Sequence, residues 1–132
     1  MMVYQWIKMA PNNVMIVGES QFNLDVDTFV NPDILVHPMA IRTGKLRGPD
    51  ALLVVEVAET TLSYDIKTKP PLYAAHGVPE YWIINAVTRE TAIYRQPSGQ
   101  TYSFEEKCSA DEILVPSLVP VLAISLKTLD LD

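Results

Sequence analysis

The fold is indicated most clearly by residues 52–58, which read LLVVEVA and place one acid, Glu56, in an otherwise apolar run. A second run, PDILVH at residues 32–37, carries Asp33 close to its start. Short apolar runs bounded by polar or proline-containing segments are typical of buried strands. An ionised carboxylate in such a strand is costly unless it is paired or holds a metal ion, so two such acids predict a functional site.

The composition describes one ordinary globular domain, spanning residues 1–132. Apolar residues make up 48% of the chain and charged residues 20%, values typical of globular rather than disordered proteins. No apolar run approaches the roughly 18 residues that a membrane span requires, and residues 1–6 lack the basic start of a signal peptide. The single cysteine, Cys108, cannot form an intramolecular disulfide. We therefore expect a cytoplasmic protein with no membrane association.

The charge is unevenly distributed along the chain. A net charge of −6 argues against a protein that coats nucleic acid non-specifically. Half of the ten basic residues nevertheless lie between positions 42 and 69, around the two strand acids. They are Arg42, Lys45, Arg47, Lys67 and Lys69. Such a cluster fits either contact with DNA or a solvated loop, and both interpretations stay open.

The rest of the chain reads as strands, then one helix, then strands again. Further strands are expected at residues 14–17, 21–24, 81–85, 91–94 and 101–104. A polar turn is expected at 23–31. Residues 62–75 carry apolar side chains near a helical period, and Gly77 is a natural stop. Pro70 and Pro71 either begin this helix or kink it, and the structure of residues 115–126 is left open by the pattern.

Asp33 and Glu56 are suited to metal-assisted hydrolysis of a phosphodiester. Mg²⁺ prefers oxygen ligands and is usually held by one or two carboxylates, several waters and the substrate phosphate. The metal would polarise the phosphate and acidify a bound water, and a nearby lysine would orient that water. His37 and His76 have no zinc-motif context, and the chain has no nucleophile elbow or glycine-rich phosphate loop.

The candidate residues also have purely structural interpretations. Asp33 could simply begin a strand or cap a turn. Tyr73 and Tyr81 are more typical of a core than of a binding site. Glu56 is hardest to explain in this way, because valines flank it on both sides.

Four segments carry a family resemblance when they are taken together. They are residues 32–36, residues 54–58, the spacing Asp65-x-x-x-Lys69-x-x-x-Tyr73, and residues 77–84, which read GVPEYWII. With them, residues 14–130 resemble a family of small bacterial restriction-endonuclease-like proteins in the PD-(D/E)XK nuclease superfamily. The resemblance implies a mixed sheet with flanking helices and a DNA-cleaving site that uses Mg²⁺, with Mn²⁺ able to replace it. On this resemblance, Asp33 and Glu56 match the metal ligands.

One departure from the family pattern concerns the catalytic lysine. The superfamily pattern expects lysine two positions after Glu56, where this chain has Ala58. In the family the lysine has moved to the following helix, which nominates Lys69, with Lys67 as a weaker substitute. Taken alone, Lys69 would instead be read as the partner of Asp65 in a surface ion pair at i,i+4 spacing.

The second departure is at the start of the chain. Family members carry a longer N-terminal segment whose helices cover the sheet, so we expect a truncated helical layer here. Because one helix covers only one face of a sheet, an apolar patch is predicted near Val3, Tyr4, Trp6 and Ile7. Two copies packed through this patch would form a homodimer with twofold symmetry.

The sequence therefore predicts an α/β domain with a restriction-endonuclease-like mixed sheet, a flanking helix and a truncated N-terminal helical layer. The preferred function is a metal-dependent endodeoxyribonuclease that acts on DNA through Asp33, Glu56 and Lys69. A catalytically inactive relative that binds DNA or protein is the first alternative. A dimeric β-rich protein whose acids are structural is the second.

Overall fold

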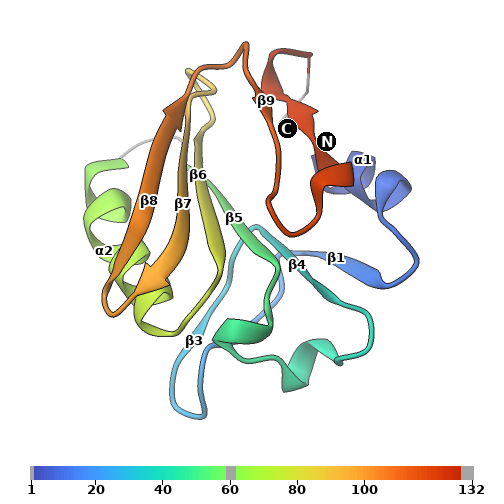
Figure 1. Ribbon diagram of the computed structural model, residues 1–132, viewed down its shortest axis with the longest axis vertical. Coiled ribbons are helices and arrows are strands. Elements are labelled where there is room, and N and C mark those ends of the chain that lie inside the picture. The colour runs from blue at the N-terminus through green and yellow to red at the C-terminus, as the bar shows by residue number, and fades with distance from the viewer. Residues whose placement is uncertain (1, 59–61, 129–132) are drawn as a thin grey trace.

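A six-stranded mixed β-sheet forms the centre of the computed structural model (Figure 1). The structure describes residues 2–58 and 62–128, the side chains of residues 62–67 and 128 excepted. The strands are β1 (Val14–Gly18), β4 (Ile34–Pro38), β5 (Leu53–Ala58), β6 (Glu80–Asn85), β7 (Thr91–Ser98) and β8 (Thr101–Cys108), in that order across the sheet. Within it, β5 and β6 are parallel and the other neighbours are antiparallel. The predicted mixed α/β fold is thus confirmed.

One face of the sheet packs against the helix α2 (Leu62–Ala75), which connects the parallel strands β5 and β6 (Figure 1). Alternation along each strand decides which side chains reach this face. Val54, Tyr81 and Tyr94 point to it from three successive strands, and Tyr73 of α2 packs on them. All four side chains are buried, so the face under α2 is a continuous core.

The opposite face is covered by segments from both ends of the chain. The helix α1 lies on this side together with the C-terminal segment (Figure 1). This covering layer consists of α1 (Met2–Met9) and, from the C-terminal segment, β9 (Ile113–Leu114), the 3-10 turn η3 (Pro120–Leu122), β10 (Ile124–Ser125) and the 3-10 turn η4 (Leu126–Thr128). Trp6 of α1 is fully buried, and its ring meets that of Trp82 edge-on, with the ring centres 5.8 Å apart.

We expected a truncated helical layer to leave this second face as an exposed apolar patch, and the structure corrects that expectation, because α1 and the C-terminal segment bury the face. Of the residues expected in an exposed apolar patch, Trp6 belongs to the core, whereas Tyr4 and Ile7 are 61% and 53% exposed. The eight residues of α1 span little more than two helical turns, so their periodicity is too short to identify a helix. On this side of the molecule, the exposed apolar side chains of Tyr4 and Ile7 belong to the covering helix, and the sheet beneath it stays buried.

Three local predictions also need correction or completion. The helix α2 begins at Leu62 and runs through both prolines, so a start at Pro70 or Pro71 is wrong. Part of the predicted polar turn at 23–31 forms a strand, because β3 (Phe29–Val30) pairs with β2 (Phe22–Asn23). Residues 115–126 hold η3 and β10, and the loop between β4 and β5 holds two 3-10 turns, η1 (Thr43–Lys45) and η2 (Gly48–Asp50).

The predicted stop of α2 at Gly77 is confirmed by its backbone geometry. Gly77 has a φ of +75°, a conformation that glycine adopts without strain. Its N–H bonds to the carbonyl of Ala74 at 3.0 Å, and the N–H of Val78 bonds to the carbonyl of Tyr73 at 3.1 Å. These two bonds form a Schellman motif, which ends the helix and turns the chain into β6.

Gly48 allows η2 to approach the end of α2 closely, which gives a stability prediction. A Cβ at Gly48 would lie 1.9 Å from the carbonyl oxygen of His76, a backbone atom that cannot swing away. Gly48→Ala is therefore expected to lower the free energy of unfolding by about 1–3 kcal/mol, the usual cost of overpacking. Gly44→Ala is the matched control, because a Cβ there meets no atom within 4 Å. Urea denaturation measures both, and equal midpoints for the two variants would contradict the close approach.

Candidate active site

The register of the central strands brings the two predicted acids to one face of the sheet. Ile34 of β4 pairs with Val55 of β5 in the antiparallel ladder. The same register, continued by one residue, places Asp33 opposite Glu56, and directly opposite residues project to the same side. A carboxylate oxygen of Asp33, Oδ2, accepts a hydrogen bond from the N–H of Val57 at 2.7 Å. Asp33 is thereby fixed beside Glu56, on the face that α2 covers.

Glu56 is held by three donors that converge on its carboxylate. Lys69 Nζ lies 3.3 Å from Oε2, and the hydroxyl of Tyr73 donates to the same oxygen at 2.8 Å. The hydroxyl of Tyr81 donates to Oε1 at 2.9 Å. The Glu56 side chain is only 12% exposed. Hydrogen bonds to a charged partner of this kind offset the cost of placing an acid in an apolar strand.

The helix α2 supplies two of these donors because of their spacing. Lys69 and Tyr73 are four residues apart and so lie on the same face of the helix. The Lys69 side chain is 30% exposed, which leaves the amine in contact with both Glu56 and solvent. The side chains of Asp65 and Lys67 lie outside the described residues, so the surface pair with Asp65 and the weaker candidate Lys67 stay untested.

The two tyrosines at Glu56 were missed as site residues by the sequence reasoning, which placed them in the core. Both tyrosines do lie in the core, because their rings are buried. They also belong to the site, because their hydroxyls donate to Glu56. The ring centres of Tyr73 and Tyr81 lie 4.4 Å apart, and the row continues through Tyr94 and Tyr102. The sequence does contain a signal that could have identified Tyr73 as a site residue. An acid in an apolar strand needs hydrogen-bond donors, and Tyr73 lies one helical turn after Lys69.

The buried tyrosines of this row make the free energy of unfolding depend on pH in the alkaline range. Burial, followed by the nearby Glu105, raises the pKa of Tyr94 to about 12. Burial also raises the pKa of Tyr102, and burial with the Glu56 charge raises that of Tyr73. A raised tyrosine pKa stabilises the fold below the unfolded value of about 10, and this stability is lost as the pH rises through the folded value.

We therefore expect the free energy of unfolding to fall between pH 10 and 12, by up to about 1.4 kcal/mol per pH unit for each tyrosine that titrates. Urea denaturation at several pH values measures the slope. Tyr94→Phe should make the slope shallower over this interval. A slope that does not change in this variant would contradict the assignment of Tyr94.

A second buried carboxylate lies on the opposite face of the sheet. Glu80 is fully buried and accepts hydrogen bonds from Trp82 Nε1 at 2.6 Å and from Arg95 Nε at 3.0 Å. Its other oxygen accepts bonds from the backbone N–H and the hydroxyl of Ser117, at 2.9 Å and 2.7 Å. Four donors satisfy this acid completely, so Glu80 ties the C-terminal segment to the sheet and has no free position for a ligand.

The histidines serve contacts within the fold. The ring nitrogens of His37 lie 2.8 Å from the carbonyl of Pro38 and 3.1 Å from the hydroxyl of Thr43. His76 contacts the carbonyl of Leu72 and, at 2.9 Å, the carboxylate of Asp25 in the β2–β3 connection.

The donor set around Asp33 and Glu56 fits a hydrated magnesium ion. Within residues 2–58 and 62–128, no group of three or more His, Cys, Asp and Glu side chains lies close enough to enclose a metal. Mg²⁺ does not require such an enclosure, because one or two carboxylates, water and a substrate phosphate complete its shell. The pair could therefore hold a cation that is shared with the substrate.

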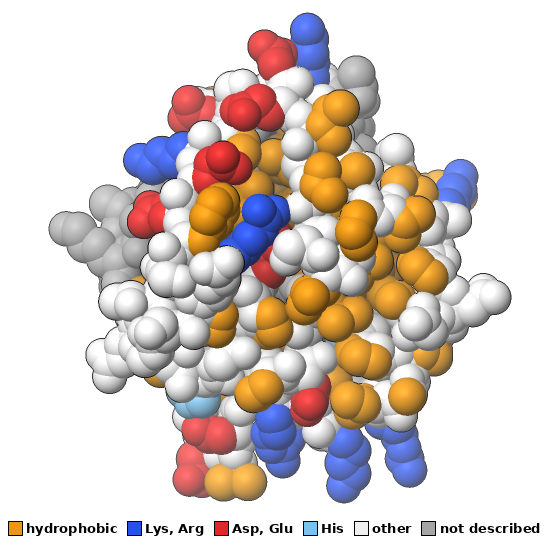
Figure 2. All heavy atoms as spheres, viewed as in Figure 1, with side chains coloured by type: hydrophobic (Ala, Val, Ile, Leu, Met, Phe, Trp, Pro, Cys, Tyr) orange, Lys and Arg blue, Asp and Glu red, His pale blue; other side chains and the backbone are white. Residues whose placement is uncertain are grey.

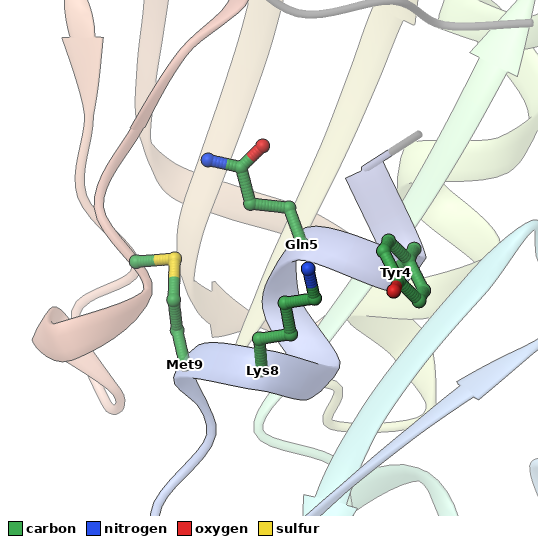
Figure 3. Close-up of a pocket in the computed structure, with 4 residues that line it drawn as sticks. All are labelled: Tyr4, Gln5, Lys8 and Met9. Carbon is green, nitrogen blue, oxygen red and sulfur yellow. The ribbon is translucent and has the colours of Figure 1, made fainter.

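A surface pocket on α1 lies away from this site. It is lined by Tyr4, Gln5, Lys8 and Met9, and Lys8 Nζ lies 4.4 Å from the centre of the Tyr4 ring (Figure 3). The pocket has no acid, and α1 covers the sheet face opposite to Glu56. It is therefore not part of the candidate site.

In the described part of the chain, no helix is long and apolar enough to cross a membrane.

Comparisons with known proteins agree with this architecture. A family model described as "Uma2: Putative restriction endonuclease" matches residues 2–128. Among solved structures, the chain is similar to a putative nuclease belonging to DUF820 from Anabaena variabilis ATCC 29413. The TM-score is 0.70 at 17% sequence identity, over 96% of this chain and 72% of that chain, so this likeness shows the fold alone. No curated protein matches the chain in sequence.

Proposed function

The chain belongs to the Uma2 family, described as putative restriction endonucleases, and we propose that it is a metal-dependent endodeoxyribonuclease. The observation that carries the proposal is the contact of Lys69 from α2 with Glu56, beside Asp33, the residue that precedes β4. Two acids and a lysine on one face are the groups that phosphodiester hydrolysis needs.

Each of the three residues has a distinct role in this reaction. Asp33 and Glu56 would hold one Mg²⁺, or Mn²⁺ in its place, which supplies positive charge at the phosphate and a more acidic bound water. Lys69 orients the attacking water and offsets the negative charge that develops on the phosphate oxygens. The water oxygen bonds to phosphorus and releases a proton to solvent, the bond to the leaving sugar oxygen breaks, and that oxygen takes up a proton from solvent.

Cleavage of supercoiled plasmid DNA tests the proposal. Nicked or linear product is expected with Mg²⁺ or Mn²⁺ and none with EDTA. Cleavage that persists in EDTA would rule out a metal-dependent reaction. If no product forms with either metal while the protein still retards DNA in a gel, the chain is a binding module and the proposal is wrong.

Lys69→Met tests the lysine separately from the acids. The variant keeps a long apolar stem and removes the charge, so we expect cleavage to fall by about 10²–10³-fold, as when one stabilising donor is lost. Mn²⁺ binding, measured by calorimetry, should persist because both acids remain. Lys127→Met is the control, since Lys127 is 69% exposed in an ion pair with Asp111 at 3.6 Å. Equal cleavage by the two variants would contradict a role for Lys69.

The inactive relative is the second candidate, and a specific observation favours it. Ala58 occupies the position where the superfamily pattern has its lysine, and it is the last residue of β5. The contact of Lys69 with Glu56 is what makes the active enzyme the better proposal. Binding of DNA without cleavage, in the plasmid experiment, would reverse this order.

A homodimer and a cytoplasmic location complete the proposal. The dimer now depends on the outer surface of the layer formed by α1 and the C-terminal segment, where Tyr4, Ile7, Leu118 and Val121 are each more than half exposed. Figure 2 shows hydrophobic side chains gathered over this layer. Such a dimer would carry one site on each subunit, on the sheet face turned away from this surface. Sedimentation equilibrium at micromolar concentration is the test, and a mass of 14.8 kDa would exclude the dimer.

A further inference from the structure

Glu56 receives its hydroxyl donors from two different elements of the core. Tyr73 belongs to α2 and Tyr81 to β6, and both side chains are fully buried. Their ring centres lie 4.4 Å apart, so each ring limits the movement of the other. Packing thus fixes the positions of the two hydroxyls before any ligand arrives.

The two hydroxyls bind different oxygens of the same carboxylate. Tyr73 donates to Oε2 and Tyr81 to Oε1, which fixes the rotation of the carboxylate as well as its place. A carboxylate has about four lone-pair positions, two on each oxygen. Lys69 and Tyr73 occupy both positions on Oε2, and Tyr81 occupies one on Oε1. Among the described contacts, Oε1 is therefore the oxygen that keeps a free position.

We propose that Tyr73 and Tyr81 are positioning residues that hold Glu56 so that Oε1 can bind the cation. The inference rests on the proposed function, because it concerns the same site. Each tyrosine would act through Glu56, because its ring is buried and its hydroxyl donates to the carboxylate. Groups of this kind orient a metal ligand, and their loss typically weakens metal affinity or activity by about 10- to 100-fold.

Phenylalanine variants test the hydroxyls without removing the rings. Tyr73→Phe and Tyr81→Phe are compared with Tyr102→Phe, whose hydroxyl donates to the backbone carbonyl of Val78 at 2.8 Å. Tyr102 lies in the same aromatic row, so the control loses a comparable hydrogen bond away from Glu56. Calorimetric titration with Mn²⁺ alone gives the affinity, and plasmid cleavage gives kcat and KM.

We expect Tyr73→Phe and Tyr81→Phe to bind Mn²⁺ about 10- to 100-fold more weakly, with a lower kcat and an unchanged KM for DNA. Tyr102→Phe should bind Mn²⁺ as the wild type does. If all three variants match a wild type that binds Mn²⁺ and cleaves DNA, the positioning role is wrong and the proposed function stands. If the wild type neither binds Mn²⁺ nor cleaves DNA, the proposed function fails and the inference fails with it.

A crystal structure of the double variant Tyr73→Phe/Tyr81→Phe gives a readout that does not depend on activity. The Glu56 carboxylate is expected to leave its position or to occupy several. A carboxylate that keeps the wild-type position without both hydroxyls would overturn the inference, whatever the affinities are.

Discussion

Glu56→Gln is expected to abolish DNA cleavage, with a loss greater than the roughly 100-fold effect typical of residues that only support a metal ligand. Glutamine keeps the shape of the side chain and removes the charge that would bind the cation. Its amide nitrogen also faces donors, because both carboxylate oxygens accept hydrogen bonds in the wild type. We therefore expect the substitution to lower the free energy of unfolding by about 1–3 kcal/mol as well.

Plasmid cleavage with Mn²⁺ and urea denaturation measure the two effects of Glu56→Gln independently. Glu90→Gln is the control for the charge change, because Glu90 is exposed at the surface. If the wild type cleaves DNA and Glu56→Gln cleaves it at the same rate, this acid has no catalytic role.

Glu80→Ala is expected to be the most destabilising single substitution considered, at about 3–5 kcal/mol. It would leave Arg95, Trp82 and Ser117 without their common acceptor in the interior. The lower end of this range is the better expectation, because the Arg95 side chain is 23% exposed and water can reach it. The C-terminal segment should detach first, since Ser117 is its link to Glu80.

Urea denaturation compares Glu80→Ala with Glu90→Ala, for which a change within about 0.5 kcal/mol is expected at an exposed position. A loss below 1 kcal/mol for Glu80→Ala would contradict the network. While the variant stays folded, its affinity for Mn²⁺ should be unchanged, because Glu80 and Glu56 point to opposite faces of the sheet.

The central part of the fold was predictable from the sequence for a clear physical reason. The strands around Asp33 and Glu56 are apolar and bounded by polar segments. The helix α2 ends at Ala75, shortly before Gly77, which has a conformation that glycine adopts easily. These signals are local, so a single chain suffices to find them.

The parts that were missed depend on contacts between distant segments. Glu80 and Ser117 are 37 residues apart, and no local pattern joins them. Trp6 becomes a core residue only because Trp82 lies beneath α1. Tyr73 was correctly placed in the core, but the direction of its hydroxyl depends on how α2 crosses the sheet, which the sequence does not reveal.

Binding of one cation by Asp33 and Glu56 is the state on which the proposed chemistry depends. Anomalous diffraction from crystals soaked in Mn²⁺ measures it directly, because manganese is located without reference to activity. We predict one peak within bonding distance of an Asp33 carboxylate oxygen and of Glu56 Oε1, which disappears in Glu56→Gln. Saturating Mn²⁺ with no peak at these two acids, in crystals of protein that cleaves DNA in solution, would contradict the assignment of the site.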